Sequence, residues 1–388
     1  MALKPKRLIR FIPILIIATF ISGCWNYREI DDQIIIAGSA VDYDKESNQL
    51  LLTTEISLPT SSKDKDFVSK VYQGKGRNIA EAIVDLRSKA GRNLLWSHSK
   101  VIIFGNELMQ QQKLFIGTLD WIKRNQEMRD TLWLLSSAEK TAGEIFEKSQ
   151  PQTQKITAFF LDYLFLTRKS ESFVSIPFWK FITDLQSSSN ASTLPLVGLI
   201  NSPSTGTLPL IAGTEMFNAT KTVNRLDDNQ TKMLLLLTNN LNQAIFAPEQ
   251  SKSKEFQTVS LKVTQSRTTI EPERLPHGLA MKIQVMMEAQ IQEIDSETDI
   301  FKPDKLKKIQ QGIATVIADK ISAFVKTIQN DQCDVIGLGN KVAIKYPELW
   351  NSMKKRWGLE FAKIPAKVHV ELLITGSEQS MGATKVRQ

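Results

Sequence analysis

Apolar and polar positions follow two different patterns near the start of the chain, and each pattern predicts a strand. Residues 33–43, QIIIAGSAVDY, are almost continuously apolar, which is typical of a buried strand. Residues 50–57 alternate with a period of two, which predicts a half-exposed strand. The polar stretch DYDKESNQ between the two runs predicts a turn, so the strands should form a hairpin.

A helical period follows the hairpin. Asn78 precedes Glu81 by three residues, as in a capping box, and the apolar stripe behind them ends at Gly91, which predicts a helix. Both strands and helices are predicted in the residues that follow. Strands are predicted at 100–104 and 131–136, and helices at 107–124, 138–148, 153–166 and 175–186, the last with Ser175 as its N-cap.

The last third of the chain predicts a helix packed on strands. Apolar residues alternate with mostly polar ones in 281–289, which indicates a strand with one buried face. Residues 306–328 carry an apolar residue at every third or fourth position, which predicts a long helix covering strands of its own domain. A final strand is predicted at 366–376. This pattern predicts a multi-domain α+β fold with antiparallel-rich sheets covered by helices, and the length of the chain is enough for two or three domains.

The composition changes between the two halves of the chain. Residues 187–209 are rich in serine, threonine and proline and have no helical stripe, so we place a domain junction there. The predicted organisation is a signal peptide at 1–23, an amino-terminal region of one or two subdomains at 24–188, a linker at 189–208, a carboxyl-terminal domain at 209–377 and a tail at 378–388.

The first 24 residues have the pattern of a bacterial lipoprotein signal. Four basic residues precede the apolar run 11–21, which is too short to span a bilayer but fits the apolar region of a signal peptide. The following Ile-Ser-Gly-Cys resembles a lipobox, whose cysteine is acylated and becomes residue one of the mature chain. We predict that Cys24 carries a diacylglyceryl thioether and an N-acyl group, which would anchor it stably in membrane lipid. The alternative is an ordinary signal peptide followed by a chance cysteine.

Composition narrows the class of protein further. Four of the 49 basic residues lie within the first ten positions, which leaves 45 basic against 41 acidic residues, and this small excess does not indicate nucleic-acid binding. Lipidation of Cys24 leaves Cys333 without a partner for an intramolecular disulfide. No later segment reaches 18 consecutive apolar residues, so we expect a soluble extracytoplasmic module attached only at Cys24.

No set of residues has the spacing of a catalytic, cofactor or metal site. His98 lies between two serines, but neighbours on a strand point to opposite faces, and no Gly-x-Ser-x-Gly turn accompanies them. Cys333 lies in an apolar context and is predicted to be a buried small side chain. We therefore predict no enzyme activity, no cofactor and no metal. Three further segments are interpreted as turns: QGKGRN at 73–78, EIDSETD at 293–299 and GLGN at 337–340.

The segment GLGNKVAIKYPELWNSMKKRW, residues 337–357, predicts an aromatic cluster. Trp350 and Trp357 fall at helical spacing with other apolar residues and are predicted to be buried against the carboxyl-terminal sheet. Gly337 and Gly339 are predicted to permit the turn that brings them there.

Three blocks of the sequence resemble the Ger(x)C family, the lipoprotein C subunits of nutrient germinant receptors in bacterial endospores. Their order and spacing over residues 23–377 are similar to the family pattern. The sequence departs from it at VNRLDDNQTK, where the family more often has a glycine. The blocks are GCWNYREIDDQIIIAGSAVDYD; SHSKVIIFGNEL with LDWIKRNQEMRDTLWLL; and CDVIGLGNKVAIKYPELWNSMKKRW with VHVELLITGS.

The resemblance implies a non-catalytic subunit with three mixed α/β domains on the outer face of the spore inner membrane. It implies assembly with two membrane partners, the polytopic A and B subunits, in a complex that triggers germination in response to nutrients. It leaves open which nutrient is sensed and whether this subunit binds it directly. Two other classes stay open from the residues themselves: a stand-alone solute-binding lipoprotein and a membrane-anchored hydrolase.

Overall fold

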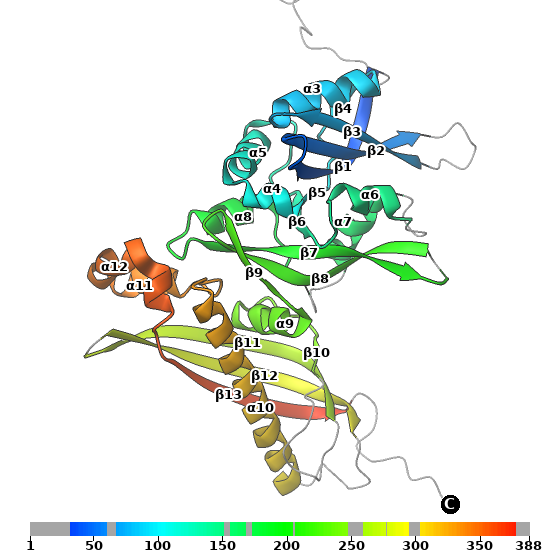
Figure 1. Ribbon diagram of the computed structural model, residues 1–388. Coiled ribbons are helices and arrows are strands. Elements are labelled where there is room, and N and C mark those ends of the chain that lie inside the picture. Colours follow the sequence, from blue (N-terminus) through cyan, green and yellow to red (C-terminus); the bar gives the residue numbers. More distant parts are fainter. Residues whose placement is uncertain are drawn as a thin grey trace, which may run out of the picture.

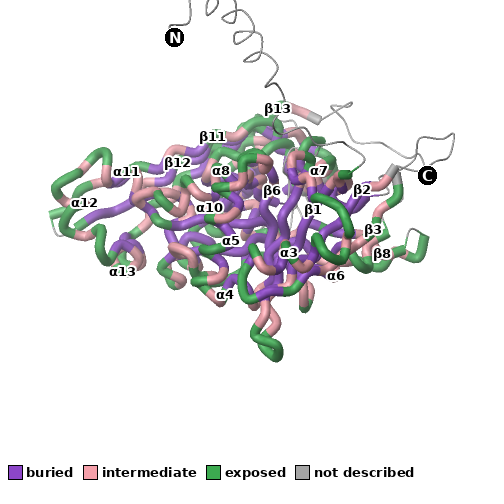
Figure 2. Tube along the Cα trace, turned by 90° about the horizontal axis from the view of Figure 1, so that it is seen from above, coloured by how far each residue is buried: buried purple, intermediate pink, exposed green. Residues whose placement is uncertain are grey.

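The computed structural model describes residues 32–59, 67–150, 156–167, 173–204, 206–246, 259–276, 278–294 and 303–377. In these residues two β-sheets are stacked one below the other, and helices cover their faces (Figure 1). The fold is mixed α/β, as the sequence predicts, and the buried residues follow the strands through the centre of the molecule (Figure 2). The division into three domains stays a prediction.

The larger sheet combines a parallel centre with antiparallel flanks. Its strand order is β3-β2-β1-β5-β6-β7-β8-β9, with β4 also beside β1. Four strand pairs are parallel: β1–β4, β1–β5, β5–β6 and β6–β7. The sequence pattern predicts mainly antiparallel sheets and does not indicate this parallel centre. The strands are β1 Gln33–Asp44, β2 Gln49–Pro59, β3 Phe67–Gly76, β4 Asn93–Leu95, β5 Val101–Phe104, β6 Trp133–Ser137, β7 Ala191–Ser202, β8 Gly206–Asn218 and β9 Lys221–Leu226.

Helices bury both faces of this sheet. One face packs against α3 (Ile79–Ala90), α4 (Asn106–Gln110), α5 (Gln112–Arg124) and α8 (Phe178–Leu185). The other packs against α6 (Gly143–Lys148) and α7 (Thr157–Thr167). The prediction that residues 50–57 are half exposed is therefore wrong. Thr53, Glu55 and Ser57 are buried because α6 and α7 cover the face that the alternating pattern assigned to solvent.

The smaller sheet has the order β10-β11-β12-β13, in which β13 runs parallel to β12. Its alternating strand is confirmed: all five apolar residues predicted to face inward between 281 and 289 are buried. The long helix α10 packs along β13, as predicted, and α9 lies between the two sheets. The elements are α9 Asp228–Leu237, β10 Ile245–Phe246, β11 Val259–Leu275, β12 Gly278–Ile294, α10 Pro303–Asn330, α11 Leu338–Lys345, α12 Pro347–Met353, the 3-10 helix η3 Lys354–Arg356, α13 Trp357–Phe361 and β13 Ala366–Ser377.

The segment predicted as a linker, 189–208, is instead part of the larger sheet. It forms β7 and the beginning of β8, which pair with each other in an antiparallel ribbon, and β7 also pairs with β6. Serine, threonine and proline indicated a loop because they are common in loops, but threonine also suits strands. Pro195 fits because a register shift follows it in the ladder, and proline is tolerated at such irregularities.

The predicted helix starts are correct at one position and wrong at another. The Asn78 side chain accepts a hydrogen bond from the Glu81 N–H at 3.0 Å, as predicted. The Glu81 carboxylate, however, accepts from the backbone of Arg77 and not from that of Asn78. Helix α8 begins after Pro177, so Ser175 is not its N-cap. Proline suits this position because it has no N–H that would need a partner.

The predicted burial is confirmed for Trp357 and wrong for Trp350, and Trp357 packs within the helical segment after α10, against Trp350 and Phe361. Trp357 is buried, whereas Trp350 is only partly buried, because the expected helix breaks into α12, η3 and α13 and leaves Trp350 at the periphery. The two indole rings still pack edge to face, with their centroids 5.1 Å apart. Gly337 has a φ of 74° in the turn before α11, as predicted. Gly339 lies inside α11 instead, where a Cβ would lie 2.8 Å from the Trp357 indole nitrogen, so it serves close packing and not a turn.

Candidate functional site

The residues weighed for chemistry in the sequence do not converge in the structure. Cys24 lies outside the described residues. His98 is exposed in the turn between β4 and β5. Cys333 is buried; its thiol donates to the Phe217 carbonyl at 3.3 Å, and burial raises its pKa to about 12, so it is no nucleophile at neutral pH. No group of three histidine, cysteine or carboxylate side chains in the described ranges is placed to hold a metal ion.

The glycine-rich segment at 73–78 has a packing role. A Cβ at Gly74 would lie 2.2 Å from the Ala82 carbonyl oxygen, and one at Gly76 would lie 2.4 Å from the Ala82 nitrogen. These glycines therefore let β3 approach α3 closely. GLGN at 337–340 contains a tight turn, but it also opens α11, which the sequence did not indicate. Most of EIDSETD lies outside the described residues.

Three buried carboxylates, missed from the sequence, each accept two consecutive backbone N–H groups where a helix begins. Asp42 binds the start of α6, Glu55 that of α7 and Asp334 that of α11. A helix start presents unpaired N–H groups and a partial positive charge, so a carboxylate is stabilised there. The contacts are Ala142 and Gly143 with Asp42, at 2.7 and 2.9 Å; Thr157 and Ala158 with Glu55, both at 2.8 Å; and Leu338 and Gly339 with Asp334, at 2.9 and 2.6 Å.

These carboxylates connect distant parts of the chain. Asp42 and Glu55 lie on β1 and β2 and reach helices 100 residues or more further along the sequence. Each binds its own helix start, and Glu55 and Asp334 each accept one further hydrogen bond, from the Ser69 hydroxyl and the Trp357 indole N–H. Because these partners belong to the fold itself, we interpret all three carboxylates as architectural. No sequence signal marks them, because a single acidic residue in a strand is compatible with many partners.

The burial of Asp42 predicts an unusual pH dependence of stability. Desolvation raises its pKa from 3.8 to about 6, against the opposing effect of its two N–H partners. The folded protein should therefore bind a proton before the unfolded chain does as the pH falls. From this group alone, the free energy of unfolding should rise by about 1.3 kcal/mol between pH 7 and pH 5.

Urea unfolding of the wild type and of Asp42→Asn at both pH values measures this contribution. Burial also raises the pKa values of Glu55 and Asp334. The wild type and Asp42→Asn both keep these two groups, so their contribution to the free energy of unfolding cancels in the comparison. An equal change in wild type and Asp42→Asn would contradict the assignment.

The clearest concave site among the described residues lies between α5, the loop after it and α8. Its floor is apolar and its rim is charged. Trp179, at the start of α8, is 48% exposed, and its backbone N–H binds the Asp130 carbonyl in the loop. The lining residues are Ile122, Lys123, Met128, Arg129, Asp130, Phe178, Trp179 and Ile182. An apolar floor with cations at its rim suits an amphiphilic group with a negative charge.

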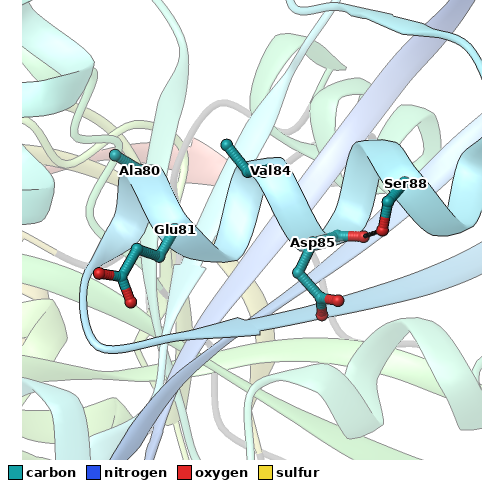
Figure 3. Close-up of a pocket in the computed structure, with 5 residues that line it drawn as sticks. All are labelled: Ala80, Glu81, Val84, Asp85 and Ser88. Atoms are coloured by element: carbon teal, nitrogen blue, oxygen red, sulfur yellow. Dashed lines mark hydrogen bonds between the residues drawn. The ribbon is translucent and has the colours of Figure 1, made fainter.

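A second, shallower hollow lies along the outer surface of α3 and is formed by Ala80, Glu81, Val84, Asp85 and Ser88 (Figure 3). All five residues come from one helix. Glu81 and Asp85 are already paired with Arg77 and Lys89, and the Ser88 hydroxyl donates to the Asp85 carbonyl. This surface therefore offers few polar groups that are not already engaged.

No helix in the described part of the chain is both long and apolar enough to cross a membrane. This observation concerns the described helices alone.

Comparison with known proteins identifies the family. Residues 26–199 match the model of the spore germination protein N-terminal domain, and residues 212–378 match the spore germination B3/GerAC-like C-terminal model. The chain is 25% identical to spore germination protein KC of Bacillus subtilis over 91% of each chain. It is 22% identical to spore germination protein GerQC of Bacillus cereus, over 95% of this chain and 98% of that protein.

The fold is similar to a solved one. The crystal structure of the GerBC protein matches 87% of this chain and 97% of its own, with a TM-score of 0.54 at 16% identity, which supports the fold. The two family models match in the expected order and together extend from residue 26 to residue 378, with a gap between residues 199 and 212 inside the β7–β8 ribbon. The chain therefore belongs to the Ger(x)C family of spore germination proteins.

Proposed function

We propose that this protein is the lipid-anchored, non-catalytic C subunit of a nutrient germinant receptor. In this proposal Cys24 carries the acyl chains, and the described module lies on the outer face of the spore inner membrane. The subunit acts together with the polytopic A and B subunits and is required for germination triggered by a nutrient. The nutrient itself and its direct contact with this subunit stay open.

The observation that carries the proposal is the paired match to both family models in one chain. Spore germination proteins of the same type match over nearly their whole length, so the chain includes the parts that these relatives share. The lipobox at Cys24 supports the anchoring. Neither the cleft between α5 and α8 nor the hollow on α3 combines a nucleophile with a base, so neither favours a hydrolase.

Deleting the gene and complementing it with a Cys24→Ala variant tests the proposal. Spores lacking the protein should lose germination in response to one class of nutrient while still responding to a non-nutrient trigger. The wild-type gene should restore the response. Cys24→Ala should leave the protein out of the membrane fraction after a high-salt wash and lower the germination rate at least tenfold, because the acyl chains are its anchor.

Cys333→Ala is the matched cysteine control, since that thiol is buried and is not part of the lipobox. It should keep the protein in the membrane fraction. Spores that germinate normally with all nutrients after deletion would overturn the receptor role. A Cys24→Ala protein that still sediments with membranes in high salt would overturn lipid anchoring alone.

A further inference from the structure

The chain enters the described fold at the amino end of β1, an interior strand of the larger sheet. Gln33, the first residue of β1, pairs in parallel with Asn93 of β4, and β5 and β6 run parallel to β1 in the adjacent positions. The amino ends of β1 and β4 lie level with each other, and β5 and β6 begin five residues further along β1, opposite Gly38. We call this end of the sheet the amino edge. Cys24 lies eight positions before Asp32, so the two Cα atoms can be at most about 29 Å apart.

Large apolar side chains are exposed at the amino edge on both faces of the sheet. On one face, Trp179 of α8 is 48% exposed at the mouth of the cleft beside α5. On the other, Tyr163 and Leu166 of α7 are 51% and 69% exposed. Asp162 of the same helix binds the indole N–H of Trp133, the first residue of β6, which fixes this part of α7 at the edge. Such side chains suit the boundary between water and lipid.

Positive charge collects at the same edge. Arg92 directly precedes β4, Lys123 lies in the last turn of α5, and Arg129 lies in the following loop; all three are exposed. None of them forms an ion pair with another described residue. The loop lies close to the entry point of the chain, because the Trp96 N–H, just after β4, donates to a Glu127 carboxylate oxygen at 3.2 Å.

The acidic residues of the amino edge are mostly engaged. Asp120 pairs with Arg124 of α5, and Asp162 pairs with Lys100. Glu127 accepts from the backbone. Two acids stay exposed: Asp130, which lines the cleft together with Lys123 and Arg129, and Asp32 at the entry point itself. The surface around the entry point therefore combines exposed aromatic and aliphatic groups with an excess of positive charge.

We infer that the amino edge rests on an anionic lipid surface, with the cleft between α5 and α8 over the headgroups. Lys123 and Arg129 would contact lipid phosphates, and Trp179 would lie at the interface. This inference rests on the proposed membrane anchoring, which brings the edge within reach of the bilayer. A lipid surface fits better than a protein partner because Trp179 is flanked by the cations Lys123 and Arg129, as in interfacial contacts.

Energy transfer from a labelled residue to an acceptor-labelled lipid tests the orientation. The full chain is reconstituted into vesicles of phosphatidylglycerol and phosphatidylcholine, with a donor dye on His98→Cys at the amino edge. The matched control carries the dye on Glu46→Cys, in the exposed turn that follows β1. That turn is about 25 Å further along the strand than the level of His98, which lies beside Ile35–Gly38 of β1. The buried Cys333 should not react with the dye.

Transfer from position 98 should exceed transfer from position 46 at least threefold in anionic vesicles. The triple variant Arg92→Glu/Lys123→Glu/Arg129→Glu should bring the ratio close to one, as should vesicles of phosphatidylcholine alone. The control triple variant Lys307→Glu/Lys308→Glu/Lys326→Glu makes the same change in net charge on exposed positions of α10 and should leave the ratio unchanged.

Equal transfer from the two positions in anionic vesicles would overturn the inference. So would a high ratio that survives both the first triple variant and the removal of anionic lipid. Mass spectrometry of the same sample shows whether Cys24 is acylated. An unmodified Cys24 would contradict the proposed anchoring but not the orientation, because the apolar run 11–21 then holds the amino terminus at the vesicle.

Discussion

Replacing Trp357 by alanine should lower the free energy of unfolding by about 3–5 kcal/mol, the usual cost of removing a buried aromatic ring. Trp357 is 5% exposed and packs against Phe361 and Trp350. Its indole N–H also donates to the buried Asp334 at 2.9 Å, so the variant leaves that carboxylate with fewer partners. Because total stability is typically about 5–15 kcal/mol, the change should deplete the folded protein in spores.

Trp350→Ala is the matched control, since the two rings are in contact but Trp350 is only partly buried. Its loss of stability should be less than half that of Trp357→Ala. Urea unfolding of the chain without residues 1–24, followed by circular dichroism, measures both. A Trp357→Ala protein that keeps wild-type stability but no longer supports germination would show that Trp357 belongs to a subunit interface instead.

Replacing Glu55 by alanine should be nearly as damaging, with an expected loss of about 3–5 kcal/mol. The change leaves the N–H groups of Thr157 and Ala158 without an acceptor inside the protein. Each buried N–H group without a hydrogen bond lowers the free energy of unfolding by about 1–3 kcal/mol. The Ser69 hydroxyl also loses its acceptor. Helix α7 should then detach from the sheet before the rest of the molecule unfolds.

Hydrogen exchange and urea unfolding of Glu55→Ala together check this expectation. Amides of α7 and the adjoining part of β1 should lose protection, while those of α10 should keep theirs. Glu81→Ala removes an exposed carboxylate from the first turn of α3 and serves as the control, which should leave the unfolding midpoint close to that of the wild type. Equal midpoints for the two variants would contradict the role assigned to Glu55.

Most individual elements could be predicted from the sequence because their signals are local. The cap at Asn78, the alternation in 281–289 and the apolar face of 306–328 depend on residues within one helix turn or one strand. The alternation in 50–57 predicted a strand for the same reason. It could not show that α6 and α7 cover the polar face, because those helices lie about 90 residues or more further along the chain.

The sequence by itself determined the kinds of element, the helix packed on strands of the smaller sheet, and the family, since ordered motif blocks are read without coordinates. Only the tertiary structure decided that 189–208 is a ribbon of the larger sheet and that Asp42, Glu55 and Asp334 bind helix starts. It also placed Trp179, Lys123 and Arg129 beside the entry point of the chain. The physical reason is that strand pairing and burial depend on contacts between residues far apart in sequence, and a local pattern is compatible with many such partners.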